Sequence, residues 1–371
     1  MPSLKEKVLQ TWTNARGWRT RRRLLVFESD DWGAIRMRDP KALRDMELGG
    51  LDVGRPVFGR IDCLENRSDL QNLFNVIDRY RDRQNSAPIF TFNTVLGNPD
   101  FAAIKADHFE RYSHEGLFQS YERYHGDDLR PVWDAAMRAS LIQPQFHARE
   151  HLNVGLWMND LRNGLAETRL AFDFDYYGLG TKTSSMRQRN YLAAYWPESP
   201  EHLREIQGIV LDGLTKFEEL FGFATRTFIA CNLVLPRELE SALASKGVKL
   251  IQGERGQITP SSSGEISIRR SFTGQRNALG QLYSVRNVKF EPFEDPSRDW
   301  VASALEEIGA SFSWGKPAII STHRVNYVSG MDANNRDQNL RLLDQLLQSI
   351  LAKWPDVEFI SSDQLLTELK Y

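Results

Sequence analysis

The sequence lacks any long apolar run. No stretch approaches the ~18 uninterrupted apolar residues that a membrane-spanning helix needs. Residues 1–20 carry scattered charges and lack the apolar centre of a secretory signal. We therefore expect a protein that stays in the cytoplasm and has no transmembrane segment.

Cysteine is also scarce, since Cys63 and Cys231 are the only two among 371 residues. Two cysteines cannot build a disulfide framework, and their spacing is not that of a structural zinc site. We expect both to be plain buried thiols.

No excess of positive charge is present either, because 49 acidic residues against 47 Lys and Arg give a formal net charge of −2. Such a chain has no overall basic field, so no nucleic-acid partner is expected. The one dense basic run extends from Arg16 to Arg23. We expect a solvated segment there, with peripheral contact to an anionic membrane surface as the alternative.

The chain does contain short apolar or β-branched runs that alternate with amphipathic helical patterns. The runs predict strands at residues 24–29, 88–95, 141–148, 171–178, 225–232, 248–253, 317–323 and 357–362. The helical patterns lie at residues 68–84, 200–222, 236–247 and 335–354. This alternation predicts a parallel sheet with helical crossovers, and no glycine-rich turn follows the first strand, which favours a β/α barrel over a dinucleotide-binding sheet.

We expect a single decorated barrel domain over residues 1–371, without internal repeats. Residues 1–22 are expected to form an N-terminal helical extension. Two stretches fit the alternation poorly and are expected to be insertions. Residues 96–140 should carry short helices and lie over the site, and residues 254–299 should form polar loop and hairpin.

Asp30 and Asp31 stand side by side where the first predicted strand ends. Two adjacent carboxylates repel each other unless a cation or hydrogen bonds stabilise them. A metal ligand beside a general base is one solution, and an exposed turn, where aspartate is common, is the other.

Two histidines, His147 and His151, follow another predicted strand in the segment QFHAREHLN. A spacing of four places both imidazoles on one side of a helical turn, whereas a straight strand would hold them roughly 13 Å apart. Two histidines and one carboxylate form a catalytic rather than a structural metal site. Two exposed histidines on one helix face would give the same pattern.

A third histidine, His323, ends the strongly apolar run AIISTH. The active sites of β/α barrels lie at the carboxyl ends of the strands, where a histidine can serve in acid–base catalysis. A capping histidine is the alternative for His323 alone. Taken together, the aspartate pair and the three histidines would meet at one rim of a barrel.

These motifs resemble those of the polysaccharide deacetylases of the carbohydrate esterase family four type. That family has a first-strand motif with two aspartates, a later H-[ST]-x-x-H motif and a late strand that ends in histidine. The matching segments here are ESDD (28–31), HAREH (147–151) and ISTH (320–323), in the same order. Ala148 replaces the usual Ser or Thr of the second motif.

The resemblance implies a distorted (β/α)7-type barrel and a divalent metal ion, with zinc as the first expectation. It implies that Asp31, His147 and His151 bind the metal, that Asp30 is the general base and that His323 is the general acid. The implied activity is removal of an N- or O-acetyl group from a sugar or glycan by metal-activated water.

The implied substrate contacts are less complete. The family's arginine–proline–tyrosine motif corresponds to ATRTFIACNLVLP, which keeps Arg226 but has neither the proline nor the tyrosine, so Asn232 is the candidate for the polar contact. Arg149 and Trp32 are further candidates for binding the substrate. Trp32 and Trp157 could stack on a sugar ring or belong to the core.

Two other functions stay open from the residues themselves. One is a metal-independent glycoside hydrolase on a similar barrel, to which Glu28 or Asp175 would contribute a carboxylate. The other is a catalytically silent carbohydrate-binding protein.

Overall fold

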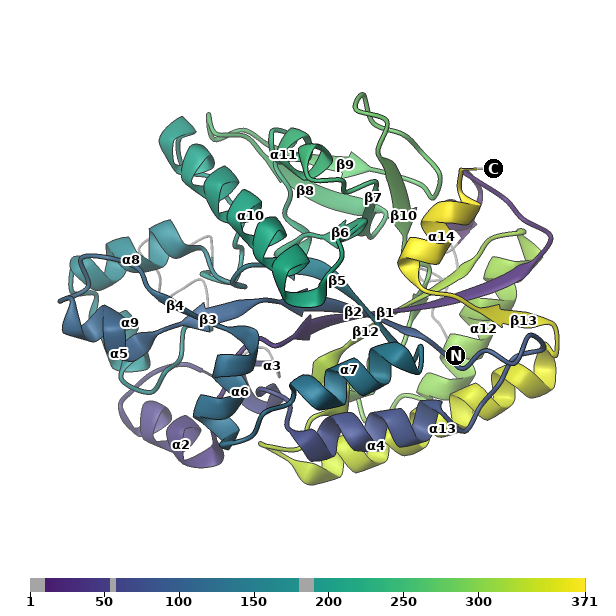
Figure 1. The fold of residues 1–371 in the computed structure, drawn as a ribbon, viewed down its shortest axis with the longest axis horizontal. Helices are drawn as coiled ribbons and strands as arrows, with labels where there is room; N and C mark the ends of the chain where they lie inside the picture. Colours follow the sequence, from purple (N-terminus) through teal and green to yellow (C-terminus); the bar gives the residue numbers. More distant parts are fainter. Residues whose placement is uncertain (1–10, 54–57, 180–189, 371) are drawn as a thin grey trace.

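A nine-stranded sheet of parallel strands forms the centre of the molecule in the computed structural model, which describes residues 11–53, 58–179 and 190–370 (Figure 1). Neighbouring strands follow the order β10-β7-β6-β5-β2-β1-β12-β11, and β13 pairs with the start of β1. The strands are β1 (Arg23–Trp32), β2 (Phe90–Val95), β5 (Ile142–Ala148), β6 (Thr227–Ile229), β7 (Leu250–Gly253), β10 (Leu282–Val285), β11 (Val288–Lys289), β12 (Ala318–His323) and β13 (Val357–Phe359).

The sheet closes on itself through residues 282–289. The first half of this segment, β10, pairs with β7, and the second half, β11, pairs with β12. Between them the Arg286 amide donates to the Gly253 carbonyl and the Asn287 amide donates to the Ile319 carbonyl. The ring therefore has seven strand positions, namely β1, β2, β5, β6, β7, the β10–β11 segment and β12. The predicted distorted (β/α)7-type barrel is confirmed.

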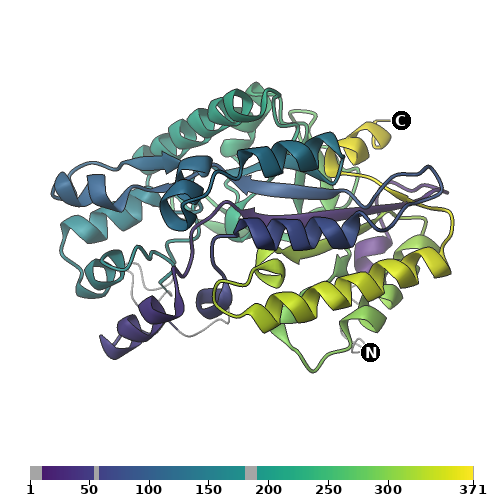
Figure 2. The same ribbon diagram turned by 60° about the horizontal axis from the view of Figure 1, so that its bottom comes forward.

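Helices cover the outside of the ring, and α4 lies beside α13 along one flank (Figures 1 and 2). Ser199 and Asn66 start their helices in the expected way, since each side chain accepts a backbone amide of the first turn. The outer helices are α4 (Arg67–Ile77), α7 (Arg130–Arg138), α10 (Pro200–Phe221), α11 (Leu239–Ser245), α12 (Trp300–Ser313) and α13 (Ala333–Lys353). The last helix, α14 (Ser362–Glu368), packs instead against inward-facing apolar side chains of the strands.

Smaller elements lie mainly in the connections that follow the carboxyl ends of the barrel strands. The helical ones are α2 (Pro40–Leu48), α3 (Phe58–Ile61), α5 (Phe101–Ala106), α6 (Leu117–His125), α8 (Val154–Arg162), α9 (Ala166–Phe172), η1 (Cys231–Leu233), η2 (Pro292–Glu294) and η3 (Arg324–Tyr327). Two antiparallel pairs are formed by β3 (Gly97–Pro99) with β4 (His114–Gly116), and by β8 (Gly256–Pro260) with β9 (Ile266–Arg270).

The side chains of β1 alternate between the two faces of the sheet. Leu25 and Phe27 face the outer core under the helices, whereas Leu24 and Val26 join the apolar cluster that includes residues of α14. Leu24 and Val26 face the interior of the barrel, and Glu28 and Asp30, which are both buried, lie on the same face of β1. The apolar half of the barrel interior is thus at one end and the charged half at the other.

Three segments differ from the sequence-based expectations. Residues 171–178 do not form a strand, because α9 continues to Phe172 and a turn follows. Residues 254–299 contain the expected β8–β9 hairpin but also the barrel strands β10 and β11, so they are not a plain insertion. Residues 96–140 carry short helices as expected, yet none of them lines the central cavity, so this segment does not lie over the site.

The amino-terminal region is only partly described. Residues 1–10 of the expected extension lie outside the described residues, and residues 11–14 are helical. Arg22 pairs with Glu358 and Glu368. Arg23 pairs with Asp356, so part of the basic run faces acidic side chains of this chain. No helix in the described ranges is long and apolar enough to cross a membrane.

Candidate active site

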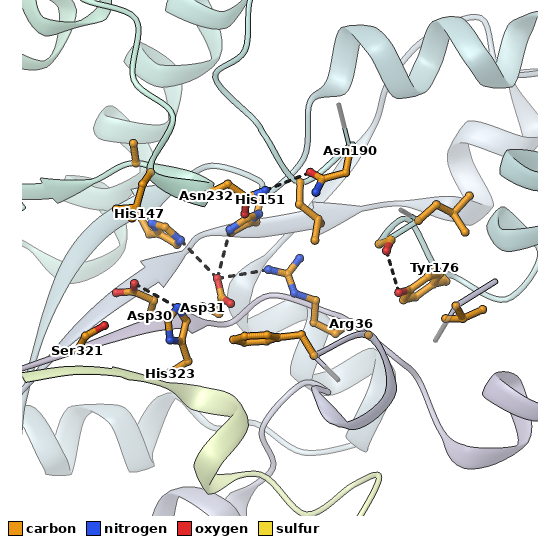
Figure 3. A pocket seen from close by; sticks show the side chains of 18 of the residues that line it. Asp30, Asp31, Arg36, His147, His151, Tyr176, Asn190, Asn232, Ser321 and His323 are labelled. Carbon is orange, nitrogen blue, oxygen red and sulfur yellow. Dashed lines mark hydrogen bonds and ion pairs between the residues drawn. The ribbon is translucent and has the colours of Figure 1, made fainter. Parts of the chain in front are cut away.

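A cavity of about 390 Å³ opens at the carboxyl ends of the barrel strands (Figure 3). Six of the candidate residues from the sequence line it, namely Asp30, Asp31, His147, His151, Asn232 and His323. The candidates Arg226, Trp32, Trp157 and Arg149 are not among its lining residues. The two aspartates and three histidines do meet at one rim of the barrel.

Two β-bulges turn side chains into this cavity. Between Ser29 and Trp32, β1 contains one more residue than the stretch of β2 with which it pairs. In this bulge Asp31 has a φ of 74°, which is unusual for a residue other than glycine. At His147, β5 likewise contains one more residue than the paired stretch of β2. A bulge re-aims a side chain that would otherwise alternate with its neighbours, and bulges are over-represented next to active sites. This is how two consecutive aspartates come to line the same cavity.

The carboxylate of Asp31 lies between the two imidazoles. Its Oδ1 is 3.4 Å from Nε2 of His147 and 3.3 Å from Nε2 of His151. Ligand atoms placed 2.0–2.1 Å from a tetrahedral zinc ion are about 3.3–3.4 Å apart. The two distances from Asp31 match this spacing, so Asp31 Oδ1 lies where it could share a divalent ion with an imidazole nitrogen.

The two histidines differ in their protonation. Nδ1 of His147 is 2.9 Å from the carbonyl oxygen of Ile229, which accepts the proton of that nitrogen and turns Nε2 towards Asp31. Burial lowers the pKa of His147, but Cys231 and the carboxylates of Asp31 and Asp30 outweigh this and raise it well above its usual value, so an ion bound there would replace the proton on Nε2. Tyr195 donates a hydrogen bond of 2.6 Å to the carbonyl oxygen of His147 and fixes the backbone there. Burial and the nearby Arg36 hold the pKa of His151 well below its usual value, so this ring is neutral.

Asp31 is ionised in spite of its burial. Burial alone would raise its pKa, but Arg36 and the imidazoles of His151 and His147 outweigh that effect and hold the pKa well below its usual value. Nη2 of Arg36 is 3.3 Å from Asp31 Oδ1, and Nε of Arg36 is 3.4 Å from Asp62 Oδ2. An ionised carboxylate is the form that binds a cation.

Asp30 has a different partner, the guanidinium of Arg286. Nη1 and Nη2 of Arg286 donate to the two carboxylate oxygens of Asp30, each at 2.7 Å, and Asn93 donates to Oδ1 at 2.7 Å. Burial raises the pKa of Asp30, but Arg286 more than reverses this and holds it well below its usual value. Asp30 is therefore ionised, oriented and only weakly basic.

The sequence reasoning missed Arg286 because it lies in the segment read as loop and hairpin. Its Nε also donates to Glu28 at 2.8 Å, and Glu28 accepts a hydrogen bond from Ser362 at 2.8 Å. Glu28 is fully buried and is not a lining residue. The alternating apolar residues of LYSV, which precede Arg286, were the available signal for a strand at this place.

His323 lies opposite Asp30 in the register of β1 and β12. Its Nδ1 is 2.5 Å from Oε1 of Glu291, and its Nε2 is 3.6 Å from Oδ2 of Asp30. Burial lowers the pKa of His323, but Glu291 and Asp30 overcome this and raise it to about 9. His323 therefore carries a proton at neutral pH. Glu291, which follows β11, was also missed from the sequence.

The remaining predicted substrate residues have structural partners elsewhere. Trp32 is buried and stacks on Phe92 with ring centroids 3.8 Å apart, and Trp157 is fully buried in the same core. Arg149 pairs with Glu150 and with Asp212.

Arg226 precedes the first residue of β6 and so lies at the opposite end of that strand from the cavity. Asn232 does line the cavity, and its Nδ2 donates to Oδ1 of Asn190 at 3.1 Å. The arginine beside Asp30 is thus supplied by Arg286 and not by Arg226.

No protein-family model and no curated protein matches the chain. Solved structures similar to it include a 4-alpha-glucanotransferase from Thermococcus litoralis (8% identity, TM-score 0.46), of which the chain spans 40% while 93% of the chain is covered. They also include a probable polysaccharide deacetylase from Pseudomonas aeruginosa PAO1 (10% identity, TM-score 0.46, 94% of this chain and 91% of that chain). A third is the PuuE allantoinase (10% identity, TM-score 0.45, 94% and 91%).

Proposed function

We propose that the protein is a metal-dependent hydrolase that removes an N- or O-acetyl group from a sugar. The observation that carries this proposal is the convergence of Asp31 Oδ1 with Nε2 of His147 and Nε2 of His151 at 3.4 and 3.3 Å. Two histidines and one carboxylate that open onto a cavity form the ligand set of a catalytic rather than a structural site. A divalent ion bound there would polarise the scissile carbonyl and lower the pKa of water towards ~7.

Asp30 and His323 would handle the two protons of the reaction. The carboxylate of Asp30, held by Arg286 and Asn93, would accept a proton from the attacking water as that water bonds to the acyl carbon. Because Asp30 is a weak base, it can do so only for a water that has become more acidic at the site. The protonated His323 would then give its proton to the leaving nitrogen or oxygen as the C–N or C–O bond breaks, which yields acetate and the free sugar.

The cavity has room and polar groups for a sugar. Its volume of about 390 Å³ lies within the usual range for small-molecule sites. Asn190 and Asn232 place amide groups on the wall, where they can exchange hydrogen bonds with hydroxyl groups.

A metal-independent glycoside hydrolase is less well supported. Such enzymes need two carboxylates that flank the scissile bond at about 5–9.5 Å from each other. Glu28 is fully buried beneath Arg286, and Asp175 pairs with Arg38 at 3.7 Å, so neither lines the cavity.

The test is an assay of acetate release from acetylated sugars, with the purified protein loaded with zinc or exhaustively chelated. We expect release only with metal, and none from the loaded Asp31→Asn protein. Glycosidic cleavage that survives chelation would support the glycoside hydrolase instead. Binding of the sugar without any turnover in the loaded protein would support a silent carbohydrate-binding protein.

A further inference from the structure

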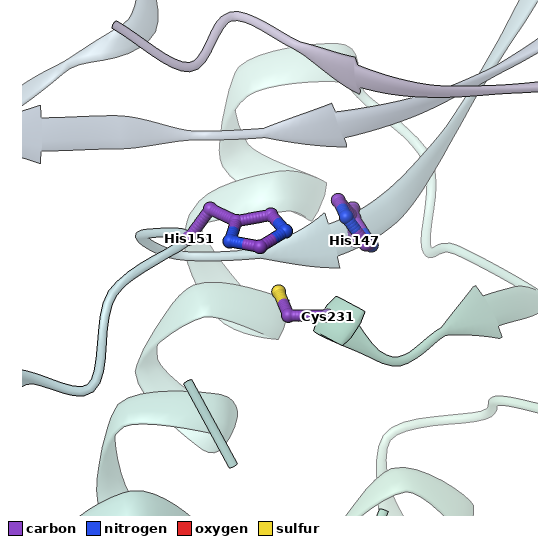
Figure 4. A group of neighbouring side chains, drawn as sticks. All are labelled: His147, His151 and Cys231. Carbon is purple, nitrogen blue, oxygen red and sulfur yellow. The ribbon is translucent and has the colours of Figure 1, made fainter. Parts of the chain in front are cut away.

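Cys231 lies against the two histidines of the candidate metal site (Figure 4). The ligand atoms of Cys231, His147 and His151 all lie within 4.8 Å of one another, and all three residues are buried. Cys231 comes from the end of β6, whereas the histidines come from the end of β5, so strand pairing brings the sulfur to this place.

The two residues that follow Cys231 have strained backbone conformations. Asn232 and Leu233 have φ values of 52° and 54°, in the left-handed region that residues other than glycine rarely adopt. Such backbone strain concentrates at functional sites and persists only where the surroundings stabilise it.

The surroundings of the sulfur are polar although the thiol is fully buried. The side chains of His147 and Tyr195 are polar neighbours of Cys231. Nδ1 of His151 has no hydrogen-bond partner in the described part of the chain, although that residue is only 3% exposed, so no hydrogen bond fixes which of its two ring nitrogens would face an ion.

From these contacts we propose that Cys231 is a further protein ligand of the ion held by Asp31, His147 and His151. This inference rests on the metal site of the proposed function. In a tetrahedral zinc site the sulfur and nitrogen ligand atoms are about 3.6 Å apart. The ligand atoms of Cys231, His147 and His151 already lie within 4.8 Å of one another, so each pair would have to approach by at most little more than 1 Å to bind one ion.

A thiolate ligand determines which metals the site prefers. Ligation replaces the S–H bond by a sulfur–metal bond and releases that proton to solvent. Thiolates favour zinc and similar soft ions over magnesium or calcium, which prefer oxygen ligands. The site then selects zinc, and zinc can still accept water or substrate by becoming five-coordinate.

The chain offers a matched control, because Cys63 is its only other cysteine and is also buried and free. The experiment titrates the metal-free full-length protein with cobalt(II) alone and records the near-ultraviolet spectrum, where a sulfur-to-cobalt charge-transfer band appears only if a thiolate is bound. We expect about one cobalt per chain and a band that is lost in Cys231→Ser and kept in Cys63→Ser. We also expect Cys231→Ser to lose at least about tenfold in zinc affinity.

Binding of cobalt without the sulfur band in the wild type overturns this inference and leaves the proposed function intact. A band that survives in Cys231→Ser, or that disappears in Cys63→Ser, overturns it as well. Failure of the wild type to bind cobalt contradicts the metal site itself and with it the proposed function. The wild-type and Cys63→Ser spectra still test the inference if Cys231→Ser does not fold.

Discussion

Asp30 and Asp31 are neighbours in the chain, yet their carboxylates face different partners. Asp30 has a guanidinium on both oxygens at 2.7 Å, so its charge is balanced within the protein. Asp31 has no such bidentate partner among the described residues, and its Oδ1 lies 3.3–3.4 Å from Arg36 and two imidazoles. The comparison agrees with the proposed roles, in which one carboxylate accepts a proton and the other binds a cation.

The largest effect should come from Asp31→Asn. The change removes a charged ligand from the Asp31–His147–His151 set but leaves the Arg286–Asp30 pair in place. We expect loss of the bound ion and a fall in kcat/KM on the order of 10⁴-fold, since a catalytic metal contributes several kcal/mol. Metal analysis and acetate release measure the two losses. An Asp31→Asn protein that keeps both the ion and the activity would contradict the assignment.

His323→Gln should impair proton transfer without affecting metal binding. We expect the ion to stay bound and kcat to fall by about 10²–10⁴-fold, the usual contribution of a general acid. In the wild type the protonated form of His323 is lost as the pH rises through about 9, so kcat should decline above that pH. Glu291→Gln removes the main cause of the raised pKa and should move this decline towards ~6.5. A pH–rate profile that is the same in the wild type and in Glu291→Gln would exclude His323 as the acid.

The same histidine predicts how stability depends on pH. The folded-state pKa of about 9 lies above the unfolded value of ~6.5, so the stabilisation from the His323–Glu291 pair is complete below ~6.5. It should be lost as the pH rises from there through about 9. Urea unfolding of the wild type and of Glu291→Gln at several pH values measures this, and equal pH slopes for the two proteins would refute it.

Arg286→Met should lower the free energy of unfolding, because it removes the buried ion pair between Arg286 and Asp30. The change leaves the buried carboxylates of Asp30 and Glu28 without their partner, which costs about 3–5 kcal/mol of unfolding free energy. Arg22→Met is the control, because the Arg22 side chain is 47% exposed and its pair with Glu358 contributes at most about 1 kcal/mol. Urea unfolding compares the two variants, and equal losses would mean that Asp30 does not depend on Arg286.

The smallest effects on the kinetic constants are expected from Asn232→Gly and Arg226→Ala, which compare a residue of the cavity wall with one outside it. Asn232→Gly keeps the left-handed backbone possible and removes an amide from the cavity wall, so KM should rise about tenfold or less. Arg226→Ala should leave kcat and KM unchanged, because that residue is not on the wall. A larger effect from Arg226→Ala than from Asn232→Gly would show that substrate binds elsewhere.

Much of the fold could be predicted because strand and helix patterns alternate clearly. The exceptions were short or polar elements: β10 and β11 together interrupt a hydrophilic segment, and the aromatic residues 171–178 resemble a strand although α9 ends there. A local pattern does not reveal that one segment pairs with β7 and then with β12. Arg286 was missed for that reason.

The residues that meet at the cavity could be predicted from the sequence where they belong to short motifs, whereas residues brought near them from distant parts of the sequence could not. Asp31, His147 and His323 each end a recognisable strand. Cys231 and Glu291 carry no local motif, and only the closed barrel brings them to the histidines. The two bulges that aim Asp31 and His147 also have no clear signature in the sequence.

The most direct test of the account is the metal content of the purified wild-type, Asp30→Asn and Asp31→Asn proteins, measured by elemental analysis after saturation with zinc and removal of the excess. We predict about one ion per chain in the wild type and in Asp30→Asn, and none in Asp31→Asn. No ion in the wild type, or equal loss in both variants, would contradict the division of roles between the two aspartates.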